Sequence, residues 1–197
     1  MTESVEFSKI DFQQITRINL IGTSGSGKST LAKRLAVTLG LPYVELDQVY
    51  WKPDWGEPSD EDFARDIRQI VEQERWVLDG NYSRMQPVKW QHVQMILWVD
   101  MSFLRTMLQI TQRSVRRAAN RQELWEGTGN RESFARSFAS RESVILWALT
   151  SFRRNRRRYA RLMSDPEWGH VTRLRLRSRS DCNALLNSAE RWNRDGA

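Results

Sequence analysis

The chain has 197 residues, a single cysteine and a formal net charge of +7. This length suits one compact P-loop kinase-like domain over residues 1–197, and one cysteine excludes an internal disulfide. The first 14 residues show no basic patch followed by an apolar core, and no apolar run approaches the roughly 20 residues of a membrane span. We therefore expect a cytoplasmic protein with no membrane partner.

The positive charge is concentrated in the second half of the chain. Residues 101–197 hold 20 basic residues against 9 acidic ones, and all 20 are arginines. Arginine binds phosphate oxygens in pairs through its planar guanidinium group, which favours phosphate-rich ligands. An ordinary solvated basic surface is the alternative interpretation.

Short apolar runs alternate with longer amphipathic stretches, which is typical of strands and helices that build a parallel sheet. The expected strands are residues 17–21, 43–46, 76–78, 93–99 and 171–176. The first four are nearly continuous apolar runs, which indicates cover on both faces, whereas the last alternates as a half-exposed edge strand would. The expected helices are residues 28–39, 60–73, 103–119, 140–163 and 181–192.

The first expected strand leads into GTSGSGKST, residues 22–30, which fits the pattern G-x-x-x-x-G-K-[ST]. Such a loop surrounds nucleotide phosphates with backbone N–H groups at a helix amino terminus. Lys28 would contact the transferred phosphate, and Ser29 would bind the Mg²⁺ ion that bridges the β- and γ-phosphates. We therefore expect ATP and Mg²⁺ as cofactors, with the nucleotide held by Gly22, Thr23, Ser24, Gly25, Ser26, Gly27, Lys28, Ser29 and Thr30.

The second expected strand ends in an acidic segment, Glu45-Leu46-Asp47, which precedes several aromatic residues. Asp47 can face the crevice and act as general base or orienting group for an acceptor hydroxyl. A solvated loop acid is the alternative. Trp51 and Trp55 either contact a ligand or serve packing. We expect residues 41–75 to form the acceptor-side segment.

The third expected strand delivers Asp79 at its carboxyl end, in WVLDGNYSR, residues 76–84. Ligands bind at this edge of open α/β sheets, so Asp79 is expected beside the phosphates, where it can hold a magnesium-bound water. Arg84 can reach a second, anionic substrate. The alternative is that Asp79 only forms a turn, because Asp-Gly is also an ordinary turn dipeptide.

The region after the fourth expected strand contains the expected lid, at about residues 113–133. Its central part has two glycines and mixed charge, which is typical of a mobile segment. The long helix that follows carries an apolar stripe surrounded by six arginines: Arg153, Arg154, Arg156, Arg157, Arg158 and Arg161.

Four segments in this order, GTSGSGKST, ELDQVYWKPDW, WVLDGNYSR and MILWVD, closely resemble the adenylate-kinase-like P-loop proteins often labelled DNA topology modulation proteins. The resemblance covers residues 17–177. More distantly, WVLDGNYSR is similar to a segment of nucleoside monophosphate kinases, and ELD resembles the acidic pair of shikimate and gluconate kinases. The resemblance implies an α/β fold of the three-layer P-loop NTPase class, with a five-stranded parallel sheet in the order 2-3-1-4-5, helices on both faces and a small lid. It also implies an acceptor in the crevice above Asp47, Asp79 and Arg84.

The resemblance further implies lid arginines. In monophosphate kinases these lie nine and thirteen residues beyond the aspartate after the fourth strand, which corresponds to Gln109 and Arg113 here. Only Arg113 matches. The missing charge can come from other arginines of the region: Arg116, Arg117, Arg121 and Arg131.

These observations predict a P-loop phosphotransferase that uses Mg-ATP and phosphorylates a small molecule or a nucleoside monophosphate. The candidate catalytic residues are Lys28, Asp47, Asp79, Arg84, Arg113 and Arg117, and the candidate metal ligands are Ser29 and Asp79. An ATP-dependent nucleic-acid-binding protein, with the arginine-rich helix along a phosphate backbone, is the less favoured alternative. A third interpretation is a phosphate-binding remnant that holds nucleotide without turnover. The sequence identifies neither the acceptor nor the oligomeric state.

Overall fold

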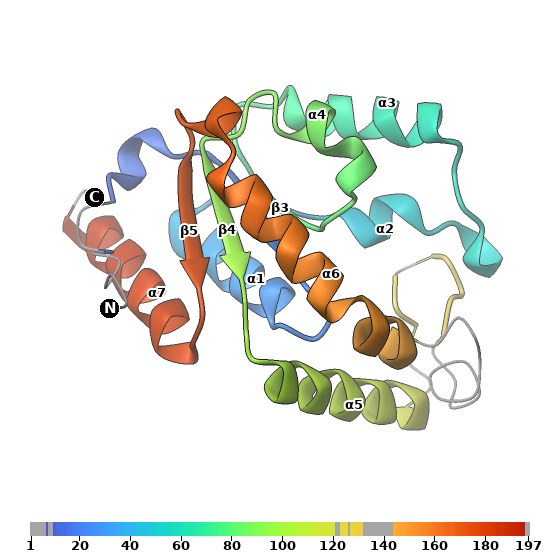
Figure 1. The fold of residues 1–197 in the computed structure, drawn as a ribbon. Coiled ribbons are helices and arrows are strands. Elements are labelled where there is room, and N and C mark those ends of the chain that lie inside the picture. Colours follow the sequence, from blue (N-terminus) through green and yellow to red (C-terminus); the bar gives the residue numbers. More distant parts are fainter. Residues whose placement is uncertain (1–6, 8–9, 121–122, 126, 132–143, 196–197) are drawn as a thin grey trace.

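The computed structural model describes residues 7, 10–120, 123–125, 127–131 and 144–195. A five-stranded parallel sheet in the order β2-β3-β1-β4-β5 forms its centre (Figure 1). The strands are β1 (Arg17–Gly22), β2 (Tyr43–Glu45), β3 (Trp76–Asp79), β4 (Met95–Val99) and β5 (Thr172–Leu176). The class and the strand order are those expected from the sequence.

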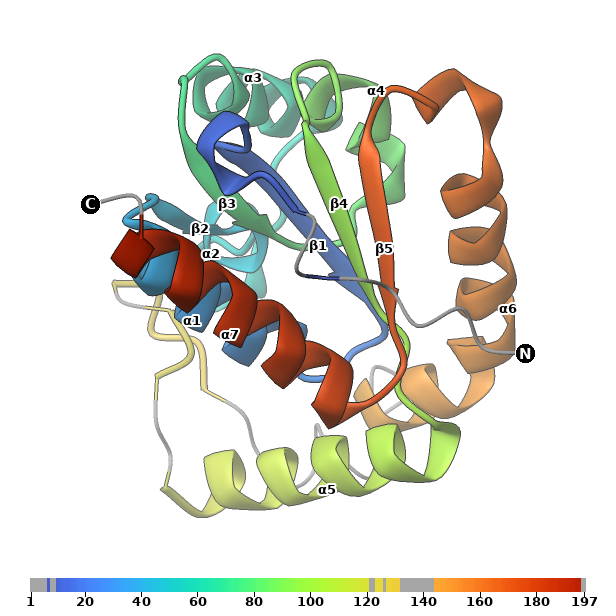
Figure 2. The ribbon, with the colours of Figure 1, turned by 90° about the vertical axis from the view of Figure 1, so that its left-hand side faces the viewer.

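Helices cover both faces of the sheet. The described α-helices are α1 (Lys28–Leu39), α2 (Leu46–Tyr50), α3 (Asp60–Val71), α4 (Gln86–Lys89), α5 (Phe103–Asn120), α6 (Val144–Ser164) and α7 (Arg179–Asp195). Short 3-10 helices lie at Phe12–Gln14, Pro53–Trp55, Ser83–Met85 and Pro166–Trp168. Figures 1 and 2 show α1 and α7 together on one face, α6 on the other, and α5 across the carboxyl ends of the strands. Among the helices that the structure describes, none combines the length and apolarity needed to cross a membrane.

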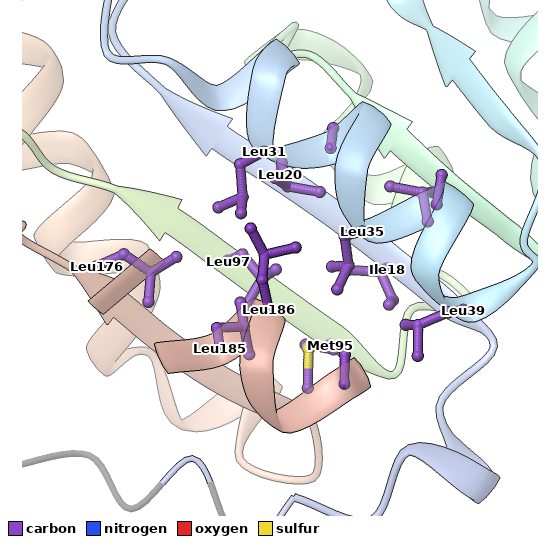
Figure 3. Close-up of a cluster of buried hydrophobic side chains, with 14 of the residues drawn as sticks. Ile18, Leu20, Leu31, Leu35, Leu39, Met95, Leu97, Leu176, Leu185 and Leu186 are labelled. Atoms are coloured by element: carbon purple, nitrogen blue, oxygen red, sulfur yellow. The ribbon is translucent and has the colours of Figure 1, made fainter. Parts of the chain in front are cut away.

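The core between the sheet and the α1–α7 layer is built largely of leucines (Figure 3). Successive side chains of a strand point to opposite faces, so Ile18 and Leu20 of β1 meet this layer together. Leu31 and Leu35 of α1 lie one turn apart and pack on them. Helix α1 ends where the sequence predicts, because Gly40 adopts a left-handed conformation with φ 62°.

A second core lies on the opposite face. Helix α3 begins after Ser59, whose side chain accepts a hydrogen bond from the Asp62 backbone N–H. It buries Phe63 and Ile67 against this face, together with Trp98 of β4. Both layers hold the carboxyl ends of the strands at one edge of the sheet, which is where the P-loop lies.

Several elements begin or end a few residues from the expected positions, and two short helices were not expected. Leu46, expected as the last residue of the second strand, begins α2 instead, because Leu46, Val49 and Tyr50 have helical spacing and pack into the second core. Helix α4 was not expected, and it has only four residues. The expected helix at 140–163 has its first residues outside the described ones, and its described part runs from Val144 to Ser164.

Candidate nucleotide and acceptor site

The P-loop connects β1 to α1 and lies against α5. Gly25 has φ 80°, and a Cβ atom placed on it would lie 2.8 Å from both the Ile110 Cβ and the Thr106 carbonyl oxygen. Glycine is therefore required there for its conformation and for its lack of a side chain. Arg113 of α5 donates a hydrogen bond from Nη2 to the Ser24 Oγ at 2.9 Å. The structure thus brings one of the sequence-predicted lid arginines into contact with the loop.

Lys28 and Asp79 face each other beside the loop. The Lys28 Nζ lies 3.7 Å from the Asp79 Oδ1, and the Asp79 side chain is 2% exposed. Its Oδ2 accepts a hydrogen bond from the Tyr43 hydroxyl at 3.0 Å, whereas Oδ1 accepts none from the described residues. A buried carboxylate oxygen without a hydrogen-bond donor indicates a place for a further positively charged or donating group.

Mg²⁺ with its bound water fits this arrangement. Within the described part of the chain, no group of three or more His, Cys, Asp or Glu side chains could hold a metal ion by itself. Mg²⁺ usually keeps several waters and binds through one or two protein oxygens together with substrate phosphates. Ser29, at the second position of α1, and the Asp79 Oδ1 are oxygens of this kind.

Tyr43 links two carboxylates of the site. Its hydroxyl lies 3.0 Å from the Asp79 Oδ2 and 3.3 Å from the Glu45 Oε2. Burial and then the charge of Asp79, followed by that of Glu45, raise the pKa of Tyr43 far above its ordinary value. Tyr43 therefore stays a neutral donor that holds Asp79 in place.

Asn81 clamps the start of the P-loop, and sequence reasoning missed it. The Gly22 N–H donates to the Asn81 Oδ1 at 2.9 Å, and the Asn81 Nδ2 donates to the Gly22 carbonyl oxygen at 2.8 Å. The two residues are 59 positions apart in the sequence. No spacing rule connects them, so only the parallel pairing of β3 with β1 reveals the contact.

Asp47 and Arg84, the two residues expected to contact an acceptor, are joined through two tyrosines. The Tyr82 hydroxyl donates to the Asp47 Oδ1 at 2.8 Å, and the Arg84 Nη2 donates to the Tyr50 hydroxyl at 3.0 Å. The rings of Tyr50 and Tyr82 have centroids 4.9 Å apart. The structure thus brings together the two residues predicted to contact the acceptor substrate. Arg84 also forms an ion pair with Asp60, with 3.2 Å between Nη1 and Oδ1.

Removal of the Tyr82 hydroxyl is expected to impair any chemistry at Asp47. Tyr82→Phe keeps the ring contacts but loses the donor that orients the Asp47 carboxylate. We expect turnover to fall about tenfold, because the net free energy of one ordinary hydrogen bond corresponds to a rate change of about this factor. The melting temperature, measured in parallel, should change little. Wild-type turnover in Tyr82→Phe would show that Asp47 needs no such support.

The described part of the expected lid lies on the acceptor-side segment. Trp125 stacks on Trp51 with centroids 6.2 Å apart and contacts Trp55 edge to face. The buried Asn130 donates from Nδ2 to the Lys52 carbonyl oxygen and accepts from the Trp55 N–H. Trp51 and Trp55 therefore pack against the lid segment in this structure.

The other lid arginines differ in their surroundings. Arg117 is half-buried one turn after Arg113, whereas Arg116 and Arg131 are exposed. Arg121 lies outside the described residues.

Two arginines of the basic helix turn toward the site, which the sequence did not predict. Arg156 of α6 pairs with the buried Asp100 at 3.0 Å, beyond the end of β4. Arg158 donates from Nη1 to the Ser83 Oγ at 2.9 Å. Helix α6 therefore contributes cations to the same edge of the sheet as the P-loop.

Several of the solved structures that resemble this chain are named kinases. A shikimate kinase from Bacteroides thetaiotaomicron has a TM-score of 0.54 at 11% identity, covering 91% of this chain and 97% of that chain. A shikimate kinase from Acinetobacter baumannii in complex with shikimate scores 0.48 at 14% identity, with 93% and 92% covered. An unliganded sugar kinase from Janibacter sp. HTCC2649 scores 0.48 at 18% identity, with 90% and 94% covered. At such identity the likeness of the first shows a shared fold.

Comparison with protein families identifies the same kind of fold. No curated protein matches the sequence. The family model described as ABC transporter matches residues 6–147, which contain the P-loop, Asp47, Asp79 and Arg84. The match spans more than half of the chain, and the chain therefore belongs to the ABC transporter family of P-loop NTPases.

Proposed function

We propose that the chain is an ATP-dependent phosphotransferase that uses Mg-ATP at the P-loop and phosphorylates a small molecule. One observation carries this proposal. The Lys28–Asp79 pair beside the loop and the Asp47–Tyr82 pair on the acceptor side come from the same edge of the sheet. Phosphoryl transfer needs a nucleotide phosphate and an acceptor at one place, with charge stabilisation between them.

Each residue of the proposed site has a separate task. Lys28 would neutralise the phosphate oxygens, and Ser29 with Asp79 would hold Mg²⁺, which supplies charge stabilisation to the transferred group. Tyr82 occupies the Asp47 Oδ1, so the other oxygen would accept the hydrogen bond of the acceptor hydroxyl. Arg113, already on Ser24, is the lid arginine best placed to meet the phosphates.

The names of the matched family and of the similar structures imply different uses of ATP. The family description names transport, whereas the structural neighbours are named shikimate kinase and sugar kinase. The acceptor-side pair supports a kinase, since a protein that only hydrolyses ATP needs no orienting residue for a second substrate. The resemblance to adenylate-kinase-like proteins labelled DNA topology modulation proteins belongs to this proposal, and it adds a nucleoside monophosphate as a candidate acceptor.

The nucleic-acid alternative loses part of its basis. It relied on the arginines of α6 as one basic surface, but Arg156 is paired with Asp100 and Arg158 contacts Ser83. Arg153, Arg154, Arg157 and Arg161 are exposed on that helix, and the side chain of Arg156 is 46% exposed despite its ion pair. Exposed arginines alone do not distinguish a nucleic-acid surface from an ordinary solvated one.

An acceptor screen with γ-labelled ATP, followed by two variants, tests the proposal. We expect Arg84→Ala to raise the acceptor KM about tenfold and Asp47→Asn to lower kcat about 100-fold, because the first residue binds and the second orients the reacting hydroxyl. The affinity for Mg-ATP should stay within about twofold in both. Steady-state kinetics with varied acceptor separates the two effects.

Arg65→Ala is the matched control for Arg84. Arg65 lies on the exposed side of α3, where its side chain is 61% exposed and pairs with Asp62 at 2.7 Å. Its loss should leave acceptor kinetics unchanged. Normal acceptor kinetics in both site variants, together with loss of DNA binding in Arg154→Ala, would reject the kinase in favour of the nucleic-acid alternative.

A further inference from the structure

Lys89 is a lysine buried without an acidic partner. Its exposed fraction is 1%, and its Nζ donates hydrogen bonds to the carbonyl oxygens of Gly80, at 3.1 Å, and Asn81. No carboxylate pairs with it among the described residues. Lysine is seldom fully buried unless it is paired, because removal of an ammonium group from water is costly. Packing alone therefore does not explain why this position is a lysine.

The turn that Lys89 holds is the turn that clamps the P-loop. Asn81 exchanges two hydrogen bonds with Gly22 at the end of β1. Gly80 directly follows Asp79, the candidate magnesium ligand. The Lys89 ammonium therefore binds the backbone carbonyls of the two residues that follow Asp79. The second of these residues, Asn81, holds Gly22 through its side chain.

The neighbouring Trp90 also contributes to the Gly80–Asn81 turn, through the side chain of Asn19. Its Nε1 donates to the Asn19 Oδ1 at 2.7 Å, and the Asn19 Nδ2 donates to the Leu78 carbonyl at 2.8 Å and the Gly80 carbonyl at 3.4 Å. All members of this network except Asn81 are buried. A buried, satisfied network of this kind rigidifies the backbone that it contacts.

The charge of Lys89 is unfavourable until an anion approaches. Burial, then the positive charges of Arg158 on α6 and Lys28 on α1, lower the pKa of Lys89 to about 7. Bound nucleotide phosphates beside Lys28 would oppose these cations and favour the charged form of Lys89. The ammonium would thus be most stable in the nucleotide-bound protein, where the loop geometry matters for transfer.

We propose that Lys89 is a positioning residue for phosphoryl transfer, whose ammonium group holds the Gly80–Asn81 turn and thereby aligns the P-loop with Asp79. This proposal rests on the proposed function. Lys89 reaches the phosphates only through the turn, so its loss should misplace Asp79 and Gly22 without removing any group that contacts ATP. A displacement of about 1 Å at such a place costs on the order of 100-fold in rate.

Lys89→Met tests the proposal, since methionine has a similar length but carries neither charge nor donor. We expect ADP formation from Mg-ATP to fall about 100-fold, and the Kd of a fluorescent Mg-ADP analogue to change less than about threefold. The melting temperature should change little, because relief of the buried charge offsets the loss of the hydrogen bonds to the Gly80 and Asn81 carbonyls. A role in packing alone predicts the opposite, a lower melting temperature with normal turnover.

Lys33→Met is the matched control, because it makes the same substitution at a lysine of α1 whose side chain is 59% exposed. It removes only a surface ion pair, so we expect turnover within about threefold of wild type. Lys89→Arg, which remains charged at every pH, should recover part of the turnover that Lys89→Met loses.

The pH profile gives an independent readout. The free protein loses the ammonium as the pH rises through about 7, so kcat/KM for ATP should fall above this pH in the wild type and not in Lys89→Arg or Lys89→Met. Turnover of the wild-type protein distinguishes a failure of the proposed function from a failure of the role proposed for Lys89. A wild type without turnover would overturn both, whereas an active wild type with a fully active Lys89→Met would overturn only the role of Lys89.

Discussion

Lys28→Ala is expected to abolish measurable turnover, with a loss of about 10³-fold or more. The Lys28 ammonium is the cation of the P-loop, and its Nζ lies 3.7 Å from the Asp79 Oδ1. Alanine removes the charge that would neutralise the transferred phosphate. It also leaves the buried Asp79 carboxylate unopposed, so that this carboxylate repels the nucleotide. Affinity for Mg-ATP should therefore fall as well, and calorimetric titration beside an assay of ADP formation measures both effects.

Lys33→Ala is the control for this variant. Lys33 lies on the same helix, five residues further on, with a side chain that is 59% exposed and 3.7 Å from the Glu45 Oε2. Surface ion pairs of this kind contribute about 0–1 kcal/mol, so near-normal turnover is expected. If Lys28→Ala kept wild-type turnover, the assignment of residues 22–30 as a nucleotide loop would be wrong.

The parts of the fold that the sequence predicts well are those whose residues meet a local backbone requirement. Gly27 and Gly40 bracket α1 in left-handed conformations with φ 92° and 62°, and both are visible as glycines around an amphipathic run. Ser59 caps α3 in the same local way. The strand order followed from the resemblance of four motifs and is confirmed by the pairing of β1 with β3 and β4.

The parts that the sequence did not predict depend on contacts between distant segments. Asn81 meets Gly22, and Tyr82 meets Asp47, across separations of 59 and 35 positions. Neither pair has a spacing that a helix or strand would impose. Lys89 looks like a surface lysine in the sequence, and only the packing of α4 against α3 and the Gly80–Asn81 turn buries it. Short elements such as α2 and α4 also offer too few residues for periodicity to separate helix from loop.

Composition was a poor guide to the basic helix for a similar reason. A run of arginines on one helix does not show which of them face inward. In the structure Tyr159 and Ala148 lie on the buried face of α6, and Arg156, although its side chain is 46% exposed, reaches Asp100. Charge that appears uniform in the sequence is therefore divided between the site and the surface.

Asp79→Asn is expected to lower turnover about 100-fold and to raise the magnesium concentration needed for half-maximal rate, while the protein remains folded. Asparagine has the shape of aspartate and can still accept the hydrogen bond of the Tyr43 hydroxyl, which now lies 3.0 Å from the Asp79 Oδ2. It lacks the charge that attracts hydrated Mg²⁺. Nucleotide affinity without magnesium should be equal or higher, because a buried negative charge near the phosphates is gone.

Tyr43→Phe separates the charge of Asp79 from its orientation. This variant removes the hydroxyl that contacts Asp79 and Glu45 but keeps both carboxylates, so the magnesium requirement should stay near that of the wild type while turnover falls only about tenfold. Magnesium titrations of turnover in the three proteins compare the two effects directly. If Asp79→Asn showed the wild-type rate and magnesium requirement, Asp79 would be no more than the first residue of an Asp-Gly turn, and the proposed metal site would have to lie elsewhere along the P-loop.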